Sequence, residues 1–207
     1  MASSSAAAFL TTVVVISLLA STSSASSRPL SAAAAGATTN TEFIRTSCIA
    51  TTYPQLCYNS LSAHATKIQT SAKLLASTAL DVTLASAKST TAAMVNLQLS
   101  HGISPRDSAA MRDCVEELGD SVGQIRQSID EMHASKGGAD FEVMISDVQT
   151  WVSAALTDET TCNDGFAGKG TAAAGEMKTA VRGKIETIGQ LTSNALALIN
   201  AYATLHH

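Results

Sequence analysis

The chain has 207 residues, of which 45% are hydrophobic, 4% aromatic and 14% charged, and its formal net charge is −4 at pH 7. This length suits one domain or at most two. The charge is unevenly distributed, because residues 107–164 hold thirteen acidic side chains and only three basic ones. The negative charge of this segment argues against binding to a nucleic acid or to an anionic membrane, because both are negatively charged.

The beginning of the chain is not expected to belong to the fold. Residues 6–20 form an apolar run of about the length of a secretory signal peptide, which is short for a membrane span. Small residues follow, and Ala25 ends a plausible cleavage site, so residues 1–25 are predicted to be a signal peptide, with a signal anchor as the alternative. Residues 26–41 are rich in Ser, Ala, Thr and Gly, which predicts a disordered leader. No later segment has an uncharged apolar run long enough to cross a bilayer, so the mature protein is expected to be secreted and to lack a membrane segment.

Four cysteines in a secreted chain fit two disulfides, for which three pairings are possible. Cys48 and Cys57 flank a short segment that contains a proline, which favours a local pair closing a turn. Cys114 and Cys162 are equidistant from Gly138, so two helices that fold back on each other there would bring the two sulfurs to the same level. Free buried thiols are the alternative.

The remainder is predicted to be helical almost throughout, because alanine and leucine are abundant and the chain has only three prolines. Four longer helices are expected, over residues 65–100, 105–134, 141–161 and 171–203. We therefore predict an all-α fold, an antiparallel up-down-up-down four-helix bundle over residues 65–203 that is preceded by a disulfide-closed N-terminal α-hairpin over residues 42–63. Residues 204–207 are expected to form a C-terminal tail.

The ends of these helices carry the expected signals. Ser104 is a good N-cap for a helix with Pro105 at its first position, and Asp140 is expected to cap the next helix. Gly165 is placed as a helix-stopping residue. The helix over residues 105–134 has the clearest apolar spacing, in Met111, Leu118, Val122, Ile125, Ile129 and Met132.

No catalytic set emerges from the sequence. The histidines do not have metal-binding helical spacings, and the glycines do not form a phosphate-binding loop or a nucleophile elbow. If all cysteines are in disulfides, no thiol nucleophile remains. We therefore expect a protein that is not an enzyme and that needs no cofactor or metal.

Four stretches together resemble the signatures of a known family, the plant invertase/pectin methylesterase inhibitor superfamily, over residues 42–203. They are Cys48-x8-Cys57 with Thr52-Tyr53-Pro54 inside, Asp113-Cys114-x-Glu116, Trp151-Val152-Ser153-Ala154-Ala155-Leu156-Thr157 followed by Thr161-Cys162-x-Asp164-Gly165-Phe166, and Thr192-Ser193-Asn194-Ala195-Leu196-Ala197-Leu198. The resemblance implies a four-helix bundle preceded by an α-hairpin, disulfides Cys48–Cys57 and Cys114–Cys162, secretion to the apoplast and cell wall, and reversible one-to-one inhibition of a carbohydrate enzyme.

The wording of these stretches favours the pectin methylesterase branch of the family, and a Pro-Lys-Phe motif that invertase inhibitors often carry late in the chain is absent. The resemblance then implies that pectin methylesterase is the partner, that its pectin-binding cleft is blocked, and that Glu116, Thr161 and Asp164 contact it. The alternatives are a plain surface acid at Glu116 and helix-end hydrogen bonds at the other two. One departure is Ser108, where the family has a basic residue that Arg106 or Arg112 would have to replace.

Two other functions remain open at this point. An inhibitor of cell-wall or vacuolar invertase belongs to the same family. A secreted helical bundle that carries a ligand is a more distant alternative, and it would require a sizeable apolar cavity.

Overall fold

The computed structural model describes residues 32–99, 104–134, 138–166 and 172–206. The expected signal peptide, residues 1–25, and the first part of the expected leader, residues 26–31, lie outside the described residues. None of the described helices is both long enough and apolar enough to cross a membrane.

The N-terminal part is a cluster of short helices: α1 (Ala32–Ile49), α2 (Pro54–Leu61), the 3-10 helix η1 (Ser62–His64) and α3 (Ala65–Ile68). The expectation of a disordered leader is wrong for residues 32–41, which form the beginning of α1. Alanine has the highest intrinsic helix propensity of any residue type, and the alanines there belong to the same continuous helix as Cys48.

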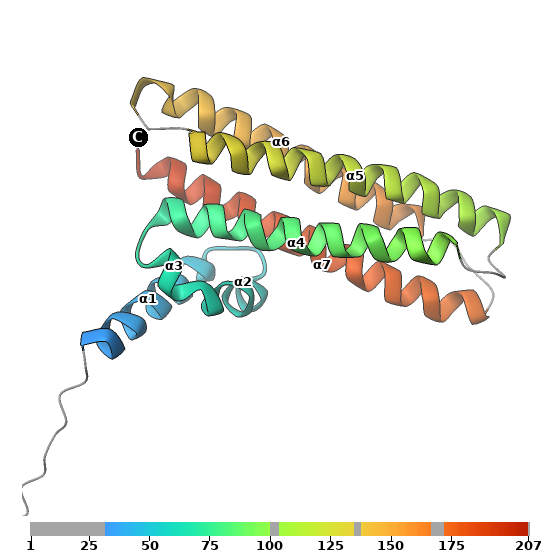
Figure 1. The fold of residues 1–207 in the computed structure, drawn as a ribbon, viewed down its shortest axis with the longest axis horizontal. Coiled ribbons are helices and arrows are strands. Elements are labelled where there is room, and N and C mark those ends of the chain that lie inside the picture. The colour runs from blue at the N-terminus through green and yellow to red at the C-terminus, as the bar shows by residue number, and fades with distance from the viewer. Residues whose placement is uncertain (1–31, 100–103, 135–137, 167–171, 207) are drawn as a thin grey trace, which may run out of the picture. The chain divides into compact units, whose positions relative to one another are not determined.

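Four long helices follow: α4 (Ala72–Gln98), α5 (Pro105–Ala134), α6 (Phe141–Gly165) and α7 (Ala172–Thr204), with the 3-10 helix η2 (Gly138–Asp140) before α6. Each long helix packs against two others, because α4 contacts α5 and α7 while α6 contacts α5 and α7 (Figure 1). This is the arrangement of an up-down-up-down bundle, as predicted. The short helices lie against one side of it, where α2 contacts α4 and α7.

The predicted continuous helix over residues 65–100 is wrong at its start, because the chain turns between α3 and α4. Gln69 has φ 54°, a region that residues with a side chain rarely adopt. Ser71 is extended, and its Oγ accepts a hydrogen bond of 3.3 Å from the amide of Leu74. Ser71 is thus the N-cap of α4, and the bundle begins at Ala72 rather than at Ala65.

The predicted cap at Ser104 is confirmed, whereas the one at Asp140 is not. The amide of Asp107 donates to Ser104 Oγ over 3.1 Å, and that hydroxyl donates in turn to Asp107 Oδ2 over 2.8 Å. Asp140 ends the 3-10 helix η2 in a helical conformation (φ −87°, ψ −1°), so its side chain makes no capping hydrogen bond. The capping geometry requires an extended residue before the helix, and the 3-10 turn removes it.

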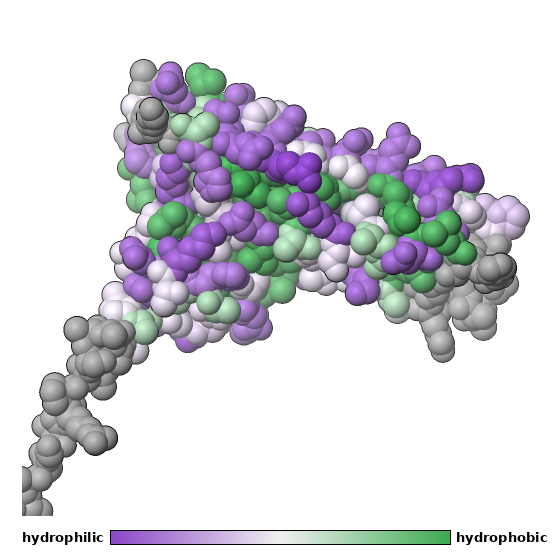
Figure 2. Space-filling model, viewed as in Figure 1, coloured by the Kyte–Doolittle hydropathy of each residue, from purple (hydrophilic) through white to green (hydrophobic). Residues whose placement is uncertain are grey.

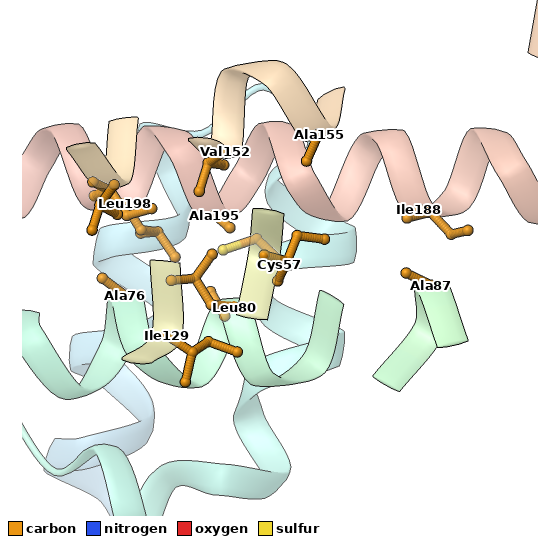
Figure 3. Packing of buried hydrophobic residues seen from close by; sticks show 14 of the residues in the cluster. Cys57, Ala76, Leu80, Ala87, Ile129, Val152, Ala155, Ile188, Ala195 and Leu198 are labelled. Carbon is orange, nitrogen blue, oxygen red and sulfur yellow. The ribbon is translucent and has the colours of Figure 1, made fainter. Parts of the chain in front are cut away.

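The core lies between the four long helices and extends to the α-hairpin. Leu80 of α4, Ile129 of α5, Val152 of α6 and Ala195 of α7 all lie in it with Cys57 of α2 (Figure 3). The apolar spacing read from α5 is confirmed, since five of its six members are buried and the sixth is packed against the core. In the view of Figure 2, hydrophilic residues cover much of the surface along α5, and hydrophobic ones show between the helices.

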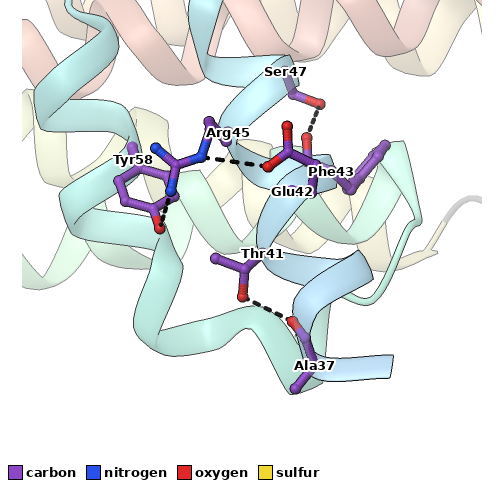
Figure 4. Close-up of polar contacts among 7 residues, drawn as sticks. All are labelled: Ala37, Thr41, Glu42, Phe43, Arg45, Ser47 and Tyr58. Carbon is purple, nitrogen blue, oxygen red and sulfur yellow. Dashed lines mark hydrogen bonds and ion pairs between the residues drawn. The ribbon is translucent and has the colours of Figure 1, made fainter. Parts of the chain in front are cut away.

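The α-hairpin is held by polar contacts as well as by packing. Within it, Arg45 lies over the ring of Tyr58, 4.4 Å from its centroid, donates to the Tyr58 hydroxyl over 3.0 Å and pairs with Glu42 at 3.4 Å (Figure 4). Polar contacts also join it to the bundle, where Asn194 of α7 accepts from the Tyr53 amide over 2.9 Å and donates to the Tyr53 carbonyl over 3.0 Å. This pair of bonds, here called the Asn194 clamp, fixes the turn between the first two cysteines on α7.

Candidate partner-binding site

Both expected disulfides are present in the structure. The first joins Cys48 to Cys57 across the turn that the Asn194 clamp holds, with the Cα atoms 5.6 Å apart. The second joins Cys114 of α5 to Cys162 of α6, with the Cα atoms 4.4 Å apart. Because it connects the beginning of α5 to the end of α6, the second disulfide fixes the relative position of the side chains around it.

The three residues that the sequence analysis placed in a partner contact lie on either side of the second disulfide. Glu116 follows Cys114 on α5, and Thr161 and Asp164 flank Cys162 near the end of α6. All three side chains are exposed. Neither carboxylate accepts a hydrogen bond from a described residue, so the helix-end bond considered for Asp164 is absent from the described part of the chain.

Thr161 does make a helical hydrogen bond. Its hydroxyl donates to the carbonyl of Thr157 over 2.9 Å, so the hydroxyl proton is occupied and only the oxygen lone pairs are left for a partner. A partner group that contacts this hydroxyl would therefore have to be a hydrogen-bond donor.

A pocket of about 270 Å³ lies beside the second disulfide, between α5 and α6. Thr161, Arg106, Asp113 and Glu117 line it, while Glu116 and Asp164 do not. Of the two arginines considered as replacements for the basic residue that the family has at Ser108, Arg106 lines the same pocket as Thr161 and Arg112 does not. The structure places Thr161 and Arg106 in the lining of one pocket, and the two exposed carboxylates lie outside that lining.

The facing surfaces of α5 and α6 are acidic. Partial burial raises the pKa of Asp158, and the negative charges of Glu117 and Asp120 raise it further, against a hydrogen bond from Gln124 that lowers it. The three carboxylates of Glu117, Asp120 and Asp158 produce a negative potential on this surface. A basic surface of a partner protein would complement it.

Glu159 is a buried acid that the sequence analysis did not single out. Only 1% of it is exposed, and its Oε1 accepts hydrogen bonds from Ser121 of α5 over 2.7 Å and from Thr192 of α7 over 2.9 Å. Burial raises its pKa to about 7, although these two bonds act in the opposite direction. The helical spacing in the sequence could have predicted its burial, because Glu159 lies four residues after Ala155 and three before Cys162, both of which are buried positions of α6.

The C-terminal stretch that carried the family resemblance also has a structural role. Thr192 holds Glu159, and Asn194 forms the clamp on Tyr53. Both side chains are buried. These buried polar residues connect α7 to the Tyr53 turn and to α6, so they hold elements of the fold together.

Comparison with known proteins identifies the family. The family model described as plant invertase/pectin methylesterase inhibitor matches residues 42–198. A 21 kDa protein from Daucus carota is 48% identical over 82% of this chain and 88% of its own length. Pectinesterase inhibitor 11 from Arabidopsis thaliana is 46% identical over 78% of this chain and 80% of its own length. The crystal structure of a mutant form of a pectin methylesterase inhibitor from Arabidopsis superposes with a TM-score of 0.61 and 25% identity, over 76% of this chain and 95% of that one. The chain therefore belongs to the plant invertase/pectin methylesterase inhibitor family.

Proposed function

We propose that this protein is a secreted inhibitor of pectin methylesterase that acts in the apoplast and cell wall, binds the enzyme reversibly and one to one, and blocks its pectin-binding cleft. The observation that carries the proposal is the similarity to proteins named pectinesterase inhibitors, at 46% identity across most of both chains. The two disulfides support secretion, since such bonds persist in oxidising compartments.

The end of the bundle around the second disulfide is the part of the surface best suited to this role. Glu116 and Asp164 are exposed carboxylates without a described partner, and the crosslink between their helices holds them in place before binding. A surface that is already ordered loses less conformational entropy when it associates. These two acids and the acceptor oxygen of Thr161 fit a partner that offers cationic and donor groups.

The first experiment measures methanol release from pectin by plant pectin methylesterases, with increasing amounts of the recombinant protein. We expect the activity to fall and to reach its minimum at an equimolar ratio, with a complex of one copy of each protein by light scattering. Full activity against several esterases would contradict the proposal. Inhibition of invertase on sucrose, without an effect on the esterases, would instead assign the protein to the other branch of the family.

The second experiment tests the site. The double variant Glu116→Ala/Asp164→Ala should bind the esterase at least about tenfold more weakly, because a hydrogen bond to a charged group contributes roughly 1.5–3 kcal/mol. Its melting temperature should match that of the wild type, since both side chains are exposed.

The matched control is Asp130→Ala/Asp140→Ala, which also removes two negative charges. Asp130 lies near the end of α5 and Asp140 directly precedes α6, so both are at the end of this helix pair away from the second disulfide, and both are exposed. The control should inhibit like the wild type. If both double variants inhibit as strongly as the wild type, Glu116 and Asp164 do not contribute to the contact. If both lose inhibition to the same extent, only the total charge of the protein matters.

A further inference from the structure

A second pocket lies on the other side of α6, between α6 and α7. Its volume is about 250 Å³, and Tyr53 of the clamped turn closes one side of it. The walls include the apolar side chains of Leu156 and Ile185. It shares no lining residue with the pocket beside the second disulfide, so it is separate from the proposed enzyme contact.

Two buried oxygen atoms of residues that line this pocket have no hydrogen-bond partner among the described residues. One is Oε2 of Glu159, whose other oxygen is held by Ser121 and Thr192. The second is Oδ1 of Asn163, one helical turn further along α6. A buried polar atom without a hydrogen-bond partner has a substantial energetic cost. Glu159 is 1% exposed and only one of its two carboxyl oxygens is hydrogen-bonded, which indicates that a bound group supplies the hydrogen bond to the other.

Gly189 lies in the pocket lining close to Glu159. A Cβ atom added at Gly189 would lie 3.8 Å from Leu156 Cδ1 and 4.0 Å from Glu159 Oε2. These are ordinary contact distances, so an alanine would fit without strain and would occupy part of the pocket floor. The absence of a side chain at this position therefore leaves the pocket floor open on the side of Glu159.

The chemistry of the lining selects the ligand. Asn163 Oδ1 is a hydrogen-bond acceptor, and so is Glu159 Oε2 once the carboxyl is ionised. A second carboxylate, Glu186, lies in the lining, and no described lysine, arginine or histidine does. A group that donates several hydrogen bonds and carries a positive charge satisfies such a site, and the apolar walls accommodate a hydrocarbon chain. We propose that this pocket binds a primary ammonium group carried on a short alkyl chain.

The size of the pocket limits what can enter. Sites for drug-sized ligands have volumes of roughly 300–1,000 Å³. A pocket of about 250 Å³ is below that range and fits a small amine, or the end of one lysine side chain. The shared feature of both sources is the terminal ammonium group.

Binding should depend on pH in a defined direction. The titratable groups in the pocket lining are Glu159, Glu186 and Tyr53, and the α6 carboxylate of Asp158 also raises the pKa of Glu159. From α5, the group that contacts Glu159 is the neutral hydroxyl of Ser121. An ammonium ion is attracted to the ionised form of Glu159, which dominates only above its pKa of about 7. The affinity for the amine should therefore rise by about tenfold or more as the pH increases from 5.5 to 8, because the fraction of the protein with an ionised Glu159 rises.

The test is an NMR titration of the full mature protein, uniformly labelled with ¹⁵N, with 1,4-diaminobutane as the probe. The neutral 1,4-butanediol serves as the control ligand, and Nα-acetyl-lysine methylamide represents a lysine side chain. The variants are Glu159→Gln and Gly189→Ala, and Gly183→Ala is the matched control because a Cβ there meets no atom within 4 Å. The glutamine keeps an oxygen that can accept from Ser121 and Thr192, and its fold is checked by its melting temperature.

We expect saturable shifts for amides around Leu156–Asn163 and Ile185–Ser193 with the diamine. Affinity should be at least about tenfold weaker in Glu159→Gln, since the charged contact is lost, and several-fold weaker in Gly189→Ala. Gly183→Ala should bind like the wild type. Saturation by the lysine derivative as well would extend the source to a side chain of a partner protein, and saturation by the diamine alone would identify a free amine. Equal binding of the diol, no saturable shift, or unchanged affinity in both variants would show that the pocket holds solvent only and would overturn the proposal.

Discussion

The substitution Glu159→Gln should remove a large pH dependence of stability. In the folded protein the pKa of Glu159 is about 7, compared with 4.5 for an ordinary glutamate, because the side chain is buried between α5, α6 and α7. A carboxyl group with a raised pKa binds its proton more tightly in the folded state than in the unfolded one. Its contribution to stability is therefore complete below about pH 4.5, is lost as the pH rises towards 7, and does not change further above that.

The magnitude follows from the difference between the two pKa values. They differ by about 2.5 pH units, and each unit corresponds to about 1.4 kcal/mol, so the free energy of unfolding should fall by about 3 kcal/mol between pH 4.5 and 7.5. For a domain of this size 1 kcal/mol changes the melting temperature by about 2–4 °C, so the expected decrease is roughly 6–12 °C. The glutamine variant cannot ionise and should lack this component.

The assay is urea unfolding of both proteins at intervals between pH 4.5 and 7.5, in phosphate–citrate buffers free of amines. Asp158 also has a raised pKa, but it is present in both proteins, so the difference between the two pH profiles isolates Glu159. Parallel profiles for the wild type and the variant would refute the reasoning, because they would mean that Glu159 does not retain its proton in the folded protein.

Three further substitutions test how the fold is held together. Replacing both cysteines of the second disulfide with serine should lower the free energy of unfolding by about 4 kcal/mol, and the same change in the first disulfide should lower it by about 3 kcal/mol. The reason is that the second disulfide closes the longer loop, with a sequence separation of 48 residues compared with 9. Urea unfolding measures both losses, and a larger loss at the first disulfide would contradict the prediction. Asn194→Ala should cost about 1–3 kcal/mol, since it leaves the Tyr53 amide without a partner while the Tyr53 carbonyl still accepts from the Cys57 amide, and faster hydrogen exchange of the Tyr53 amide is the specific readout. Ser71→Ala should cost about 1 kcal/mol of unfolding free energy through the lost cap, and Ser71→Asp should restore it.

The long helices could be predicted because each has a local signal. The apolar positions of α5 recur at helical spacing and are buried in the structure, and Ser104 with Pro105 marks the start of that helix. The beginning of α1 could not be predicted, because a run of alanines has the same composition in a helix as in a low-complexity leader. The break before α4 was missed because it contains no glycine or proline, and Ser71 is one of many serines in the chain.

The candidate site divides in the same way. The second disulfide could be placed from sequence, since Cys114 and Cys162 lie at equal distances from the turn between their helices. The surroundings of Glu159 and Asn194 could not, because their partners come from other helices and depend on how the helices face each other. Periodicity shows that a polar residue lies on a buried face, but it does not show which hydroxyl or amide completes it.

The Asn194 clamp has a consequence for the order of events in folding. It joins positions 141 residues apart in the chain, and Asn194 can reach the Tyr53 turn only when α7 is already in its place in the bundle. We therefore expect the four long helices to assemble before the amino-terminal cluster settles on them. In the reverse direction, detachment of that cluster should be the first opening that the native protein undergoes, and its amides should exchange while those deep in the bundle are still protected.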